Sequence, residues 1–112
     1  MPLIDQTTFN ELKQMSGEDF INELIDTFLE DAPIMIAEIK SALSTNNAET
    51  FRRAAHSMKS NAATFGAGQL ATLAKELEML GKENKLHETG NKLMALEEAY
   101  ASVRNELEGL KS

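Results

Sequence analysis

Residues 51–65 have the sequence FRRAAHSMKSNAATF, and this stretch determines how the rest of the chain is interpreted. Successive residues of an α-helix turn by about 100°, so the apolar and polar residues of this stretch gather on opposite sides. The apolar side is predicted to be buried, and it consists of Phe51, Ala55, Met58, Ala62 and Phe65. The other side is predicted to be an exposed working surface, and it consists of Arg52, His56, Lys59, Ser60 and Ala63.

The composition favours one small helical domain, residues 1–112, with a single core. A balance of 11 basic and 18 acidic residues, net −7, argues against binding to nucleic acid or to an anionic membrane. No apolar run is long enough to span a bilayer. The chain has no cysteine, which excludes disulfides and thiolate metal sites, and it shows no leader pattern. A reducing, cytoplasmic setting is therefore expected.

The segments before the histidine helix predict a short helix and a long one. Residues 7–15 should form the short helix, which ends near Gly17 and caps the bundle. Residues 18–43 keep one helical phase across Pro33, so we expect one long helix with a kink there rather than two helices. Its expected core residues are Phe20, Leu24, Phe28, Met35, Ile39 and Leu43.

The segments that follow complete an all-α fold, an up-and-down antiparallel four-helix bundle with a short N-terminal capping helix. Asn46 and Glu49 have the spacing of an N-cap and its carboxylate partner, so the histidine helix should begin there. It should end at Gly66, the next helix at Gly81, and the last helix should cover about residues 86–110. The core residues expected from the last two helices are Leu70, Leu73, Ala74, Leu77, Leu80, Leu93, Leu96, Tyr100, Val103, Leu107 and Leu110.

The exposed histidine is the candidate reactive group. An exposed imidazole with the reference pKa of about 6.5 is substantially neutral near pH 7, so a ring nitrogen can act as a nucleophile toward a phosphoryl group. Lys59, one turn further along the helix, could offset the charge of the transferred group, and Ser60 could donate a hydrogen bond. Arg52 and Arg53 add positive charge beside His56, which predicts an anionic reactant. An ordinary solvated helix face is the alternative explanation of these charges.

The surface along this helix is low in relief. Ser60 and Ala63 are small, and a large residue at either position would hold an incoming protein away from the ring of His56. This favours docking of a macromolecule over binding of a small ligand, although helix propensity alone also explains small residues.

These residues resemble the signature of the histidine-containing phosphotransfer (HPt) domain family. That signature has a histidine, a lysine three residues later, a small residue next to it, an alanine, a hydrophobic residue followed by glycine, and a leucine. Ser60 stands where many members have glycine, which is a small departure. Residues 28–33 and 73–80 also resemble the helices that flank the histidine helix in the family, so the resemblance spans almost the whole chain. The matching residues are His56, Lys59, Ser60, Ala63, Phe65, Gly66 and Leu70.

The resemblance implies a phosphorelay intermediate in two-component signalling. A phosphoryl group would pass from the aspartyl phosphate of one receiver domain to His56 and on to the aspartate of another, in response regulators or a hybrid histidine kinase. Such a carrier is not an enzyme with kinase activity of its own and holds no cofactor or metal, because the receiver brings the carboxylates and Mg²⁺. Glu78 lies where the phosphotransfer domain of chemotaxis kinases has a glutamate that bonds the proximal ring nitrogen.

The same resemblance implies a monomer that binds receivers through an apolar patch with polar contacts at its rim. Arg52, Arg53, Ala63 and Gly66 are the residues expected to bind the partner. The first helix and the start of the second are expected to contribute through Phe9, Leu12 or Ile21.

Three other functions fit part of the pattern. A histidine kinase dimerisation domain also carries phosphohistidine in a four-helix bundle, but it builds the bundle from two chains and has an acidic residue where this chain has Ser57. A metal-carrying bundle could use His56 and His87 with carboxylates, but the paired Glu-x-x-His motifs of such sites are missing. A structural adaptor, in which His56 is incidental and His87 an ordinary surface residue, is the third alternative.

Overall fold

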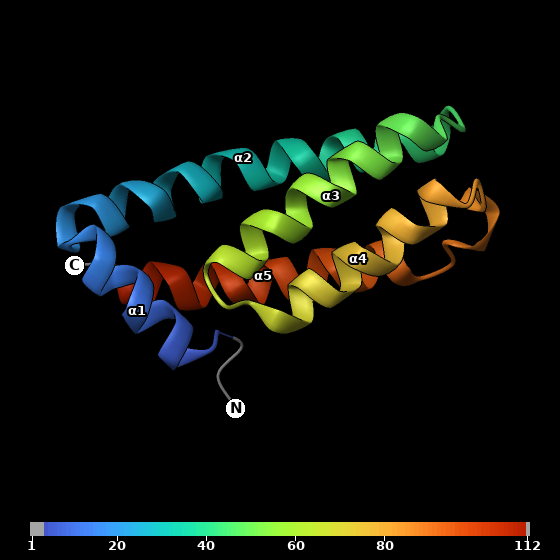
Figure 1. Ribbon diagram of the computed structural model, residues 1–112. Coiled ribbons are helices and arrows are strands. Elements are labelled where there is room, and N and C mark those ends of the chain that lie inside the picture. Colours follow the sequence, from blue (N-terminus) through green and yellow to red (C-terminus); the bar gives the residue numbers. More distant parts are fainter. Residues whose placement is uncertain (1–3, 112) are drawn as a thin grey trace.

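The computed structural model describes residues 4–111, which form five α-helices and one 3₁₀ turn (Figure 1). Four long helices make an antiparallel up-and-down bundle, and the short first helix covers one end of it, as predicted. The described residues contain no strand. The elements are α1 (Gln6–Ser16), α2 (Glu18–Ser44), α3 (Ala48–Thr64), α4 (Gly68–Lys82), η1 (Leu86–Glu88) and α5 (Lys92–Leu110).

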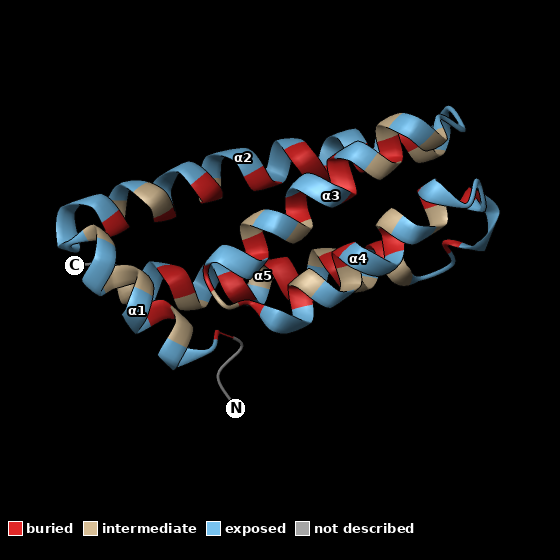
Figure 2. Cartoon of the chain, in the orientation of Figure 1, coloured by how far each residue is buried: buried red, intermediate tan, exposed pale blue. Residues whose placement is uncertain are grey.

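The core lies along the axis of the bundle, where buried positions of all four long helices face inward (Figure 2). An aromatic cluster joins three parts of the fold. The ring of Phe28 on α2 lies 5.3 Å from that of Phe65 after α3 and 5.9 Å from that of Tyr100 on α5. Aromatic pairs at such distances stabilise a core beyond the area that they bury. This aromatic cluster therefore holds α2 against α5 and against the end of α3.

Helix α2 is one continuous helix through Pro33, as predicted, and the kink expected there stays a prediction. The expected core stripe is partly wrong. Phe20 is 49% exposed and Leu24 is half-buried, because both lie toward an edge of the inward face. Leu43 is half-buried next to the end of the helix. The buried residues of α2 are Ile21, Ile25, Phe28, Ala32, Met35, Ile36, Ile39 and Ala42.

The cap of the histidine helix is Asn47 and not Asn46. The side-chain oxygen of Asn47 accepts a hydrogen bond from the backbone N–H of Thr50 at 3.1 Å. Asn46 instead has a φ of 56°, in the left-handed region, and lies in the turn after α2. Asparagine is favoured both as an N-cap and in the left-handed region. The sequence therefore does not show which of the two asparagines is the cap, and the geometry of the turn decides it.

Helix α1 is held against the turn between α3 and α4. The backbone N–H of Asp5 donates to the carbonyl of Gly66 at 2.8 Å, and the Asp5 side chain caps α1 by accepting from the N–H of Thr7. Gly66 has a φ of 76°, and a Cβ there would lie 2.9 Å from the Cβ of Thr8. Glycine at position 66 thus ends the histidine helix, as predicted, and also allows the capping helix to approach.

The end of α4 and the start of α5 differ from the sequence-based prediction. Gly81 lies inside α4, which continues to Lys82, and Asn84 with a φ of 57° makes the turn. The last long helix begins at Lys92, because residues 86–88 form only the 3₁₀ turn η1. The hydroxyl of the buried Thr89 donates to the carbonyl of Leu86 at 2.7 Å, which stabilises this turn.

Candidate functional site

Helix α3 presents His56 to solvent from the middle of the bundle. The predicted apolar stripe on the other side of the helix is buried throughout. The imidazole side chain is 54% exposed. Arg53 and Ser60 are its neighbours on the outward surface, because residues three and four apart lie side by side on a helix. A protein that approaches α3 from solvent therefore reaches His56 directly.

Glu78 on α4 holds the proximal nitrogen of the His56 ring. Its Oε2 atom lies 2.6 Å from Nδ1 of His56, a distance of a short, charge-assisted hydrogen bond. A carboxylate accepts hydrogen bonds, so this contact assigns the proton of the neutral ring to Nδ1. The lone pair then lies on Nε2, which has no hydrogen-bond partner among residues 4–111. The geometry presents a nucleophilic nitrogen toward solvent.

The same carboxylate also binds Lys59. Nζ of Lys59 lies 2.7 Å from Oε1 of Glu78, so each oxygen of Glu78 contacts one residue of α3. The Glu78 side chain is 14% exposed. Burial by itself raises the pKa of Glu78, but the hydrogen bonds from Lys59 and His56 outweigh burial and hold that pKa below its ordinary value of 4.5. Glu78 is therefore ionised near neutral pH.

Arg52 and Arg53 lie beside His56, where both contact Glu49. Nη2 of Arg52 is 2.6 Å from Glu49 Oε1, and Nε of Arg53 is 3.8 Å from the same oxygen. The hydrogen bond from Arg52 lowers the pKa of Glu49, and Glu49 in turn raises the pKa of Arg52. The positive surface predicted around His56 is thus largely compensated by two carboxylates, those of Glu49 and Glu78.

Two of the residues that follow His56 on the outward side of α3, Ser60 and Ala63, are small, so no bulky side chain projects from these positions. Ser60 and Ala63 are both exposed, as their positions on the helix predicted. Gly66 is half-buried and touches α1, so its position serves the turn between α3 and α4. A contact of Gly66 with a partner stays a prediction.

The apolar residues expected in the docking patch are mostly in the core instead. Phe9 and Ile21 are 3% and 1% exposed, so neither offers a surface to a partner, and Leu12 is half-buried. Phe9 and Ile21 belong to the hydrophobic core, and Leu12 packs against it. The exposed apolar residues of this end are Met15, which the sequence did not single out, and Phe20, which was expected in the core.

Ile34 and Met79 are two further exposed apolar residues that the sequence-based prediction missed. Ile34 on α2 is 59% exposed and Met79 on α4 is 41% exposed. The helical wheel of α2 could have identified Ile34, because at 100° per residue it falls opposite the buried face.

The remaining candidates lie apart from this site. Among residues 4–111 there is no group of three or more His, Cys, Asp or Glu side chains that could hold a metal ion. His87 is an exposed residue of η1 with Nε2 3.6 Å from Glu88. In the described part of the chain, no helix is long and apolar enough to cross a membrane.

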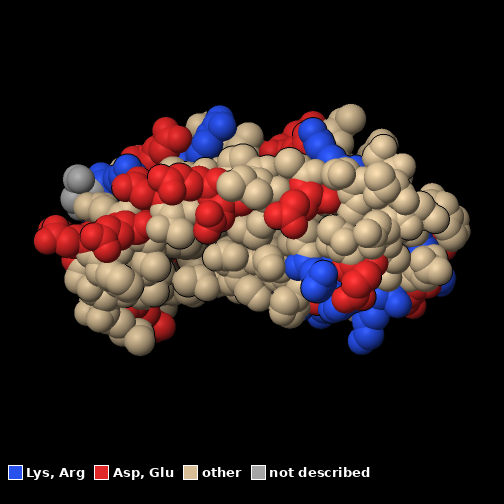
Figure 3. All heavy atoms as spheres, turned by 90° about the horizontal axis from the view of Figure 1, so that it is seen from above, with Lys and Arg blue, Asp and Glu red and all other residues tan. Residues whose placement is uncertain are grey.

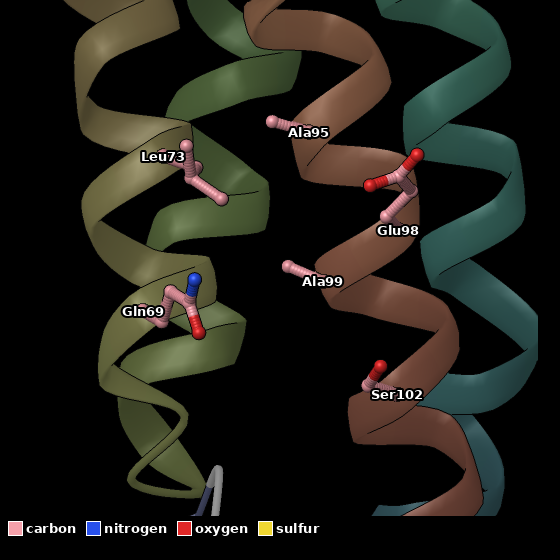
Figure 4. Close-up of a pocket in the computed structure, with 6 residues that line it drawn as sticks. All are labelled: Gln69, Leu73, Ala95, Glu98, Ala99 and Ser102. Atoms are coloured by element: carbon pink, nitrogen blue, oxygen red, sulfur yellow. The ribbon is translucent and has the colours of Figure 1, made fainter.

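A hollow of about 270 Å³ lies between α4 and α5 (Figure 4). Figure 4 shows Gln69 and Leu73 on α4 facing Ala95 and Ala99 on α5. Glu78 points from α4 toward α3, so this hollow lies on the other side of α4 from the histidine.

Comparisons with known proteins agree on one family. The family model described as "Hpt domain" matches residues 23–106. Phosphorelay protein LuxU of Vibrio harveyi is 28% identical over 110 residues, which cover 92% of this chain and 96% of LuxU. Sensor protein TorS of Escherichia coli (strain K12) is 31% identical over 75 residues, which cover 67% of this chain and 8% of TorS.

A solved structure has the same fold. The crystal structure of histidine-containing phosphotransfer protein B (HptB) from Pseudomonas aeruginosa PAO1 superposes with a TM-score of 0.92. The two chains are 26% identical, and the match covers 98% of this chain and 95% of HptB.

Proposed function

The chain belongs to the Hpt domain family, and on this premise we propose that Nε2 of His56 is the atom that carries the phosphoryl group. The function of the chain is histidine phosphotransfer in a phosphorelay. His56 would accept the group from an aspartyl phosphate of one receiver domain and pass it to the aspartate of another. The observation that supports His56 most directly is its 2.6 Å contact to Glu78, which leaves Nε2 unprotonated and without a partner in the described chain.

In the proposed step, the lone pair of Nε2 attacks phosphorus while the bond between phosphorus and the aspartyl oxygen breaks. The aspartate regains its carboxylate charge. The phosphorylated ring keeps the proton on Nδ1 and gains a positive charge, which the adjacent carboxylate of Glu78 stabilises. The reverse step is equally available, since the ring accepts and returns the group without losing a proton.

Lys59 would offset the negative charge of the phosphoryl group. Its ammonium has three hydrogens, and one of them serves the hydrogen bond to Glu78. The others can reach toward a phosphoryl oxygen on the neighbouring turn. Ser60 would donate a hydrogen bond or simply leave room for the partner.

The partner would supply the rest of the chemistry. We infer that the chain is a phosphocarrier without kinase activity of its own, and that the carboxylates and Mg²⁺ of a receiver stabilise the transferring group. Receivers of response regulators or of a hybrid histidine kinase fit this role, with Arg52, Arg53, Ala63 and Gly66 among the contacts. We further propose that the chain is a monomer, that residues 1–112 form a single domain, and that the protein lies in the cytoplasm.

A transfer experiment tests the role of His56. The chain and its His56→Gln variant would be mixed with a panel of phosphorylated receiver domains, and base-stable, acid-labile label would be followed on each protein. We expect label on the unmodified chain and none on the variant. His87→Gln is the matched control, because His87 is the other histidine and lies outside the site.

The control variant should be labelled at the rate of the unmodified chain. Label on the His56→Gln variant, or no label on the unmodified chain from any receiver, would overturn the assignment of His56.

A further inference from the structure

Beside His56, a groove runs between α2 and α3. It consists of two adjoining hollows of about 290 and 330 Å³, which share Met35, Glu38 and Ser57 as walls. Ser57 directly follows His56 in the chain, so one wall of the groove continues into the surface that presents the histidine. The other residues that line the groove are Asp31, Ile34, Thr50, Arg53, Ala54 and Asn61.

The α2 wall of this groove combines one exposed apolar side chain, next to the buried Met35, with two unpaired carboxylates. Ile34 is 59% exposed and lies between Asp31 and Glu38 in the chain. Asp31 and Glu38 are exposed, and neither takes part in an ion pair among residues 4–111. An apolar centre with charges at its edge is the usual make-up of a protein-binding surface.

Charge is distributed unequally on the two sides of the histidine. Helix α2 has seven acidic residues and one lysine, a net charge of −6. Helices α3 and α4 together have five basic and three acidic residues, a net charge of +2. In Figure 3 the face seen from above carries a run of acidic side chains toward the end where α2 begins. His56 therefore lies next to the boundary between an acidic helix and a mildly basic pair of helices.

We propose that the groove between α2 and α3 is a docking surface for a receiver domain that carries Lys or Arg residues over α2. This inference rests on the proposed function and adds the chemistry of the partner. The carboxylate-rich pocket of the receiver must face His56, which lies on α3 and contacts α4, the mildly basic pair of helices. Asp31 and Glu38 then meet the surface that flanks this pocket, where acidic residues would repel them and Lys or Arg residues would pair with them.

The two kinds of contact have separate consequences. Opposite charges at the rim of an interface mainly speed association, and salt weakens them. The apolar contact of Ile34 mainly slows dissociation. The groove would thus select among receivers by charge, while His56 performs the same transfer with each of them.

Two double variants test the proposal. Asp31→Lys with Glu38→Lys reverses the charges of the groove, and Asp19→Lys with Glu23→Lys reverses two exposed charges nearer the start of the same helix. The control pair lies about 20 Å from the groove along α2, at a rise of about 1.5 Å per residue. Both variants change the net charge equally, so general electrostatic attraction changes alike.

The measurement is the second-order rate constant of transfer from the receiver that labels the unmodified chain fastest, at low and at high salt. We expect the groove variant to be slower by on the order of tenfold at low salt, with most of the salt dependence lost. The control variant should change by less than about twofold. Ile34→Ala should weaken binding of the receiver by on the order of tenfold, the lower end of what burial of one large apolar side chain contributes.

Reaction with phosphoramidate, a small phosphodonor that needs no docking surface, shows whether the variants keep a folded and reactive His56. All of them should be modified at the same rate, measured by mass. Equal transfer rates for the two double variants, or a slower reaction of the groove variant with phosphoramidate, would overturn the docking assignment and leave the proposed function intact. No transfer from any receiver to the unmodified chain would remove the proposed function and this inference with it.

Discussion

Oε2 of Glu78 on α4 lies 2.6 Å from Nδ1 of His56 on α3, and the contact joins residues 22 positions apart in the chain. Its length depends on the packing of α3 against α4, because neither helix alone brings the two side chains together. The carboxylate fixes the ring by one nitrogen and leaves the other toward solvent. A structural contact between two helices thereby decides which ring nitrogen can react.

Replacement of Glu78 should slow phosphotransfer without removing it. Glu78→Ala loses the contact that orients the ring and, in the proposed mechanism, the negative charge that would stabilise the phosphorylated imidazole. We expect a rate lower by on the order of tenfold, the lower end of what supporting hydrogen bonds contribute to metal-bound histidines. Glu78→Gln keeps a hydrogen-bond acceptor but loses the charge, so its phosphotransfer rate should fall between those of Glu78→Ala and the unmodified chain. Nitrogen chemical shifts of the ring would report whether the proton leaves Nδ1.

Equal rates for Glu78→Ala and the unmodified chain would show that Glu78 has no part in the transfer. A changed ring tautomer with an unchanged rate would limit its role to the resting state.

The lowered pKa of Glu78 predicts a pH dependence of stability. The folded protein binds a proton at Glu78 less readily than the unfolded chain, so the contribution of this carboxylate is fully present above about pH 4.5. It is lost as the pH falls through the lowered pKa of the folded state. Charge-assisted hydrogen bonds contribute about 1–3 kcal/mol, and we expect Glu78→Gln to lower the free energy of unfolding by about 1–2 kcal/mol at pH 7.

Urea denaturation of both proteins at pH 7 and at pH 3 measures the difference. The gap between them should shrink at pH 3, where Glu78 is protonated in the unfolded chain. A gap that is constant across this range would mean that the carboxylate charge does not stabilise the fold.

Sequence alone was sufficient to predict which residues of α3 face away from the core. The positions of His56, Lys59 and Ser60 relative to the buried stripe depend only on the period of one helix, which a sequence states directly. The contact of Glu78 with His56 was expected only through resemblance to a known family. That Glu78 also binds Lys59 was not expected at all, because the register between two helices is set by their packing.

The sequence-based predictions that were wrong concern residues whose burial or helix membership depends on contacts between helices. A helix face has edges, and Phe20 lies at an edge where periodicity does not distinguish exposed from buried residues. Phe9 and Ile21 are expected from the sequence to contact a partner, but they are buried, because the packing of α1 against α2 is a tertiary contact that periodicity does not show. Residues 86–88 continue the apolar pattern of α5, yet the turn at Thr89 and Gly90 interrupts the helix.

The cap at Asn47 should contribute measurably to stability. Loss of an N-cap side chain costs about 1 kcal/mol, so Asn47→Ala should lower the free energy of unfolding by about that amount. Asn47→Asp keeps a side-chain oxygen for the N–H of Thr50 and serves as the control, with stability near that of the unmodified chain. Thermal unfolding of the three proteins compares them. Asn47→Ala with unchanged stability would mean that solvent satisfies the start of α3 equally well.

Gly81 allows α4 to approach α3 closely, and this predicts an unusual effect of alanine. A Cβ at position 81 would lie 3.0 Å from the backbone nitrogen and Cα of Arg52, which cannot move without shifting α3. Glycine to alanine inside a helix normally stabilises it by up to about 1 kcal/mol. Gly81→Ala should instead destabilise the protein by about 1–3 kcal/mol, the usual cost of overpacking.

Gly109→Ala is the matched control for this substitution, since Gly109 also lies within a helix and a Cβ there would meet no atom within 4 Å. It should leave the protein as stable or slightly more stable. Denaturant unfolding of both variants gives the two free energies, and their opposite signs would identify the contact with Arg52 as the cause. Because the same contact sets the distance between α3 and α4, Gly81→Ala should also loosen the pairing of His56 with Glu78 and slow phosphotransfer. A Gly81→Ala protein as stable as Gly109→Ala would show that the two helices separate at no cost.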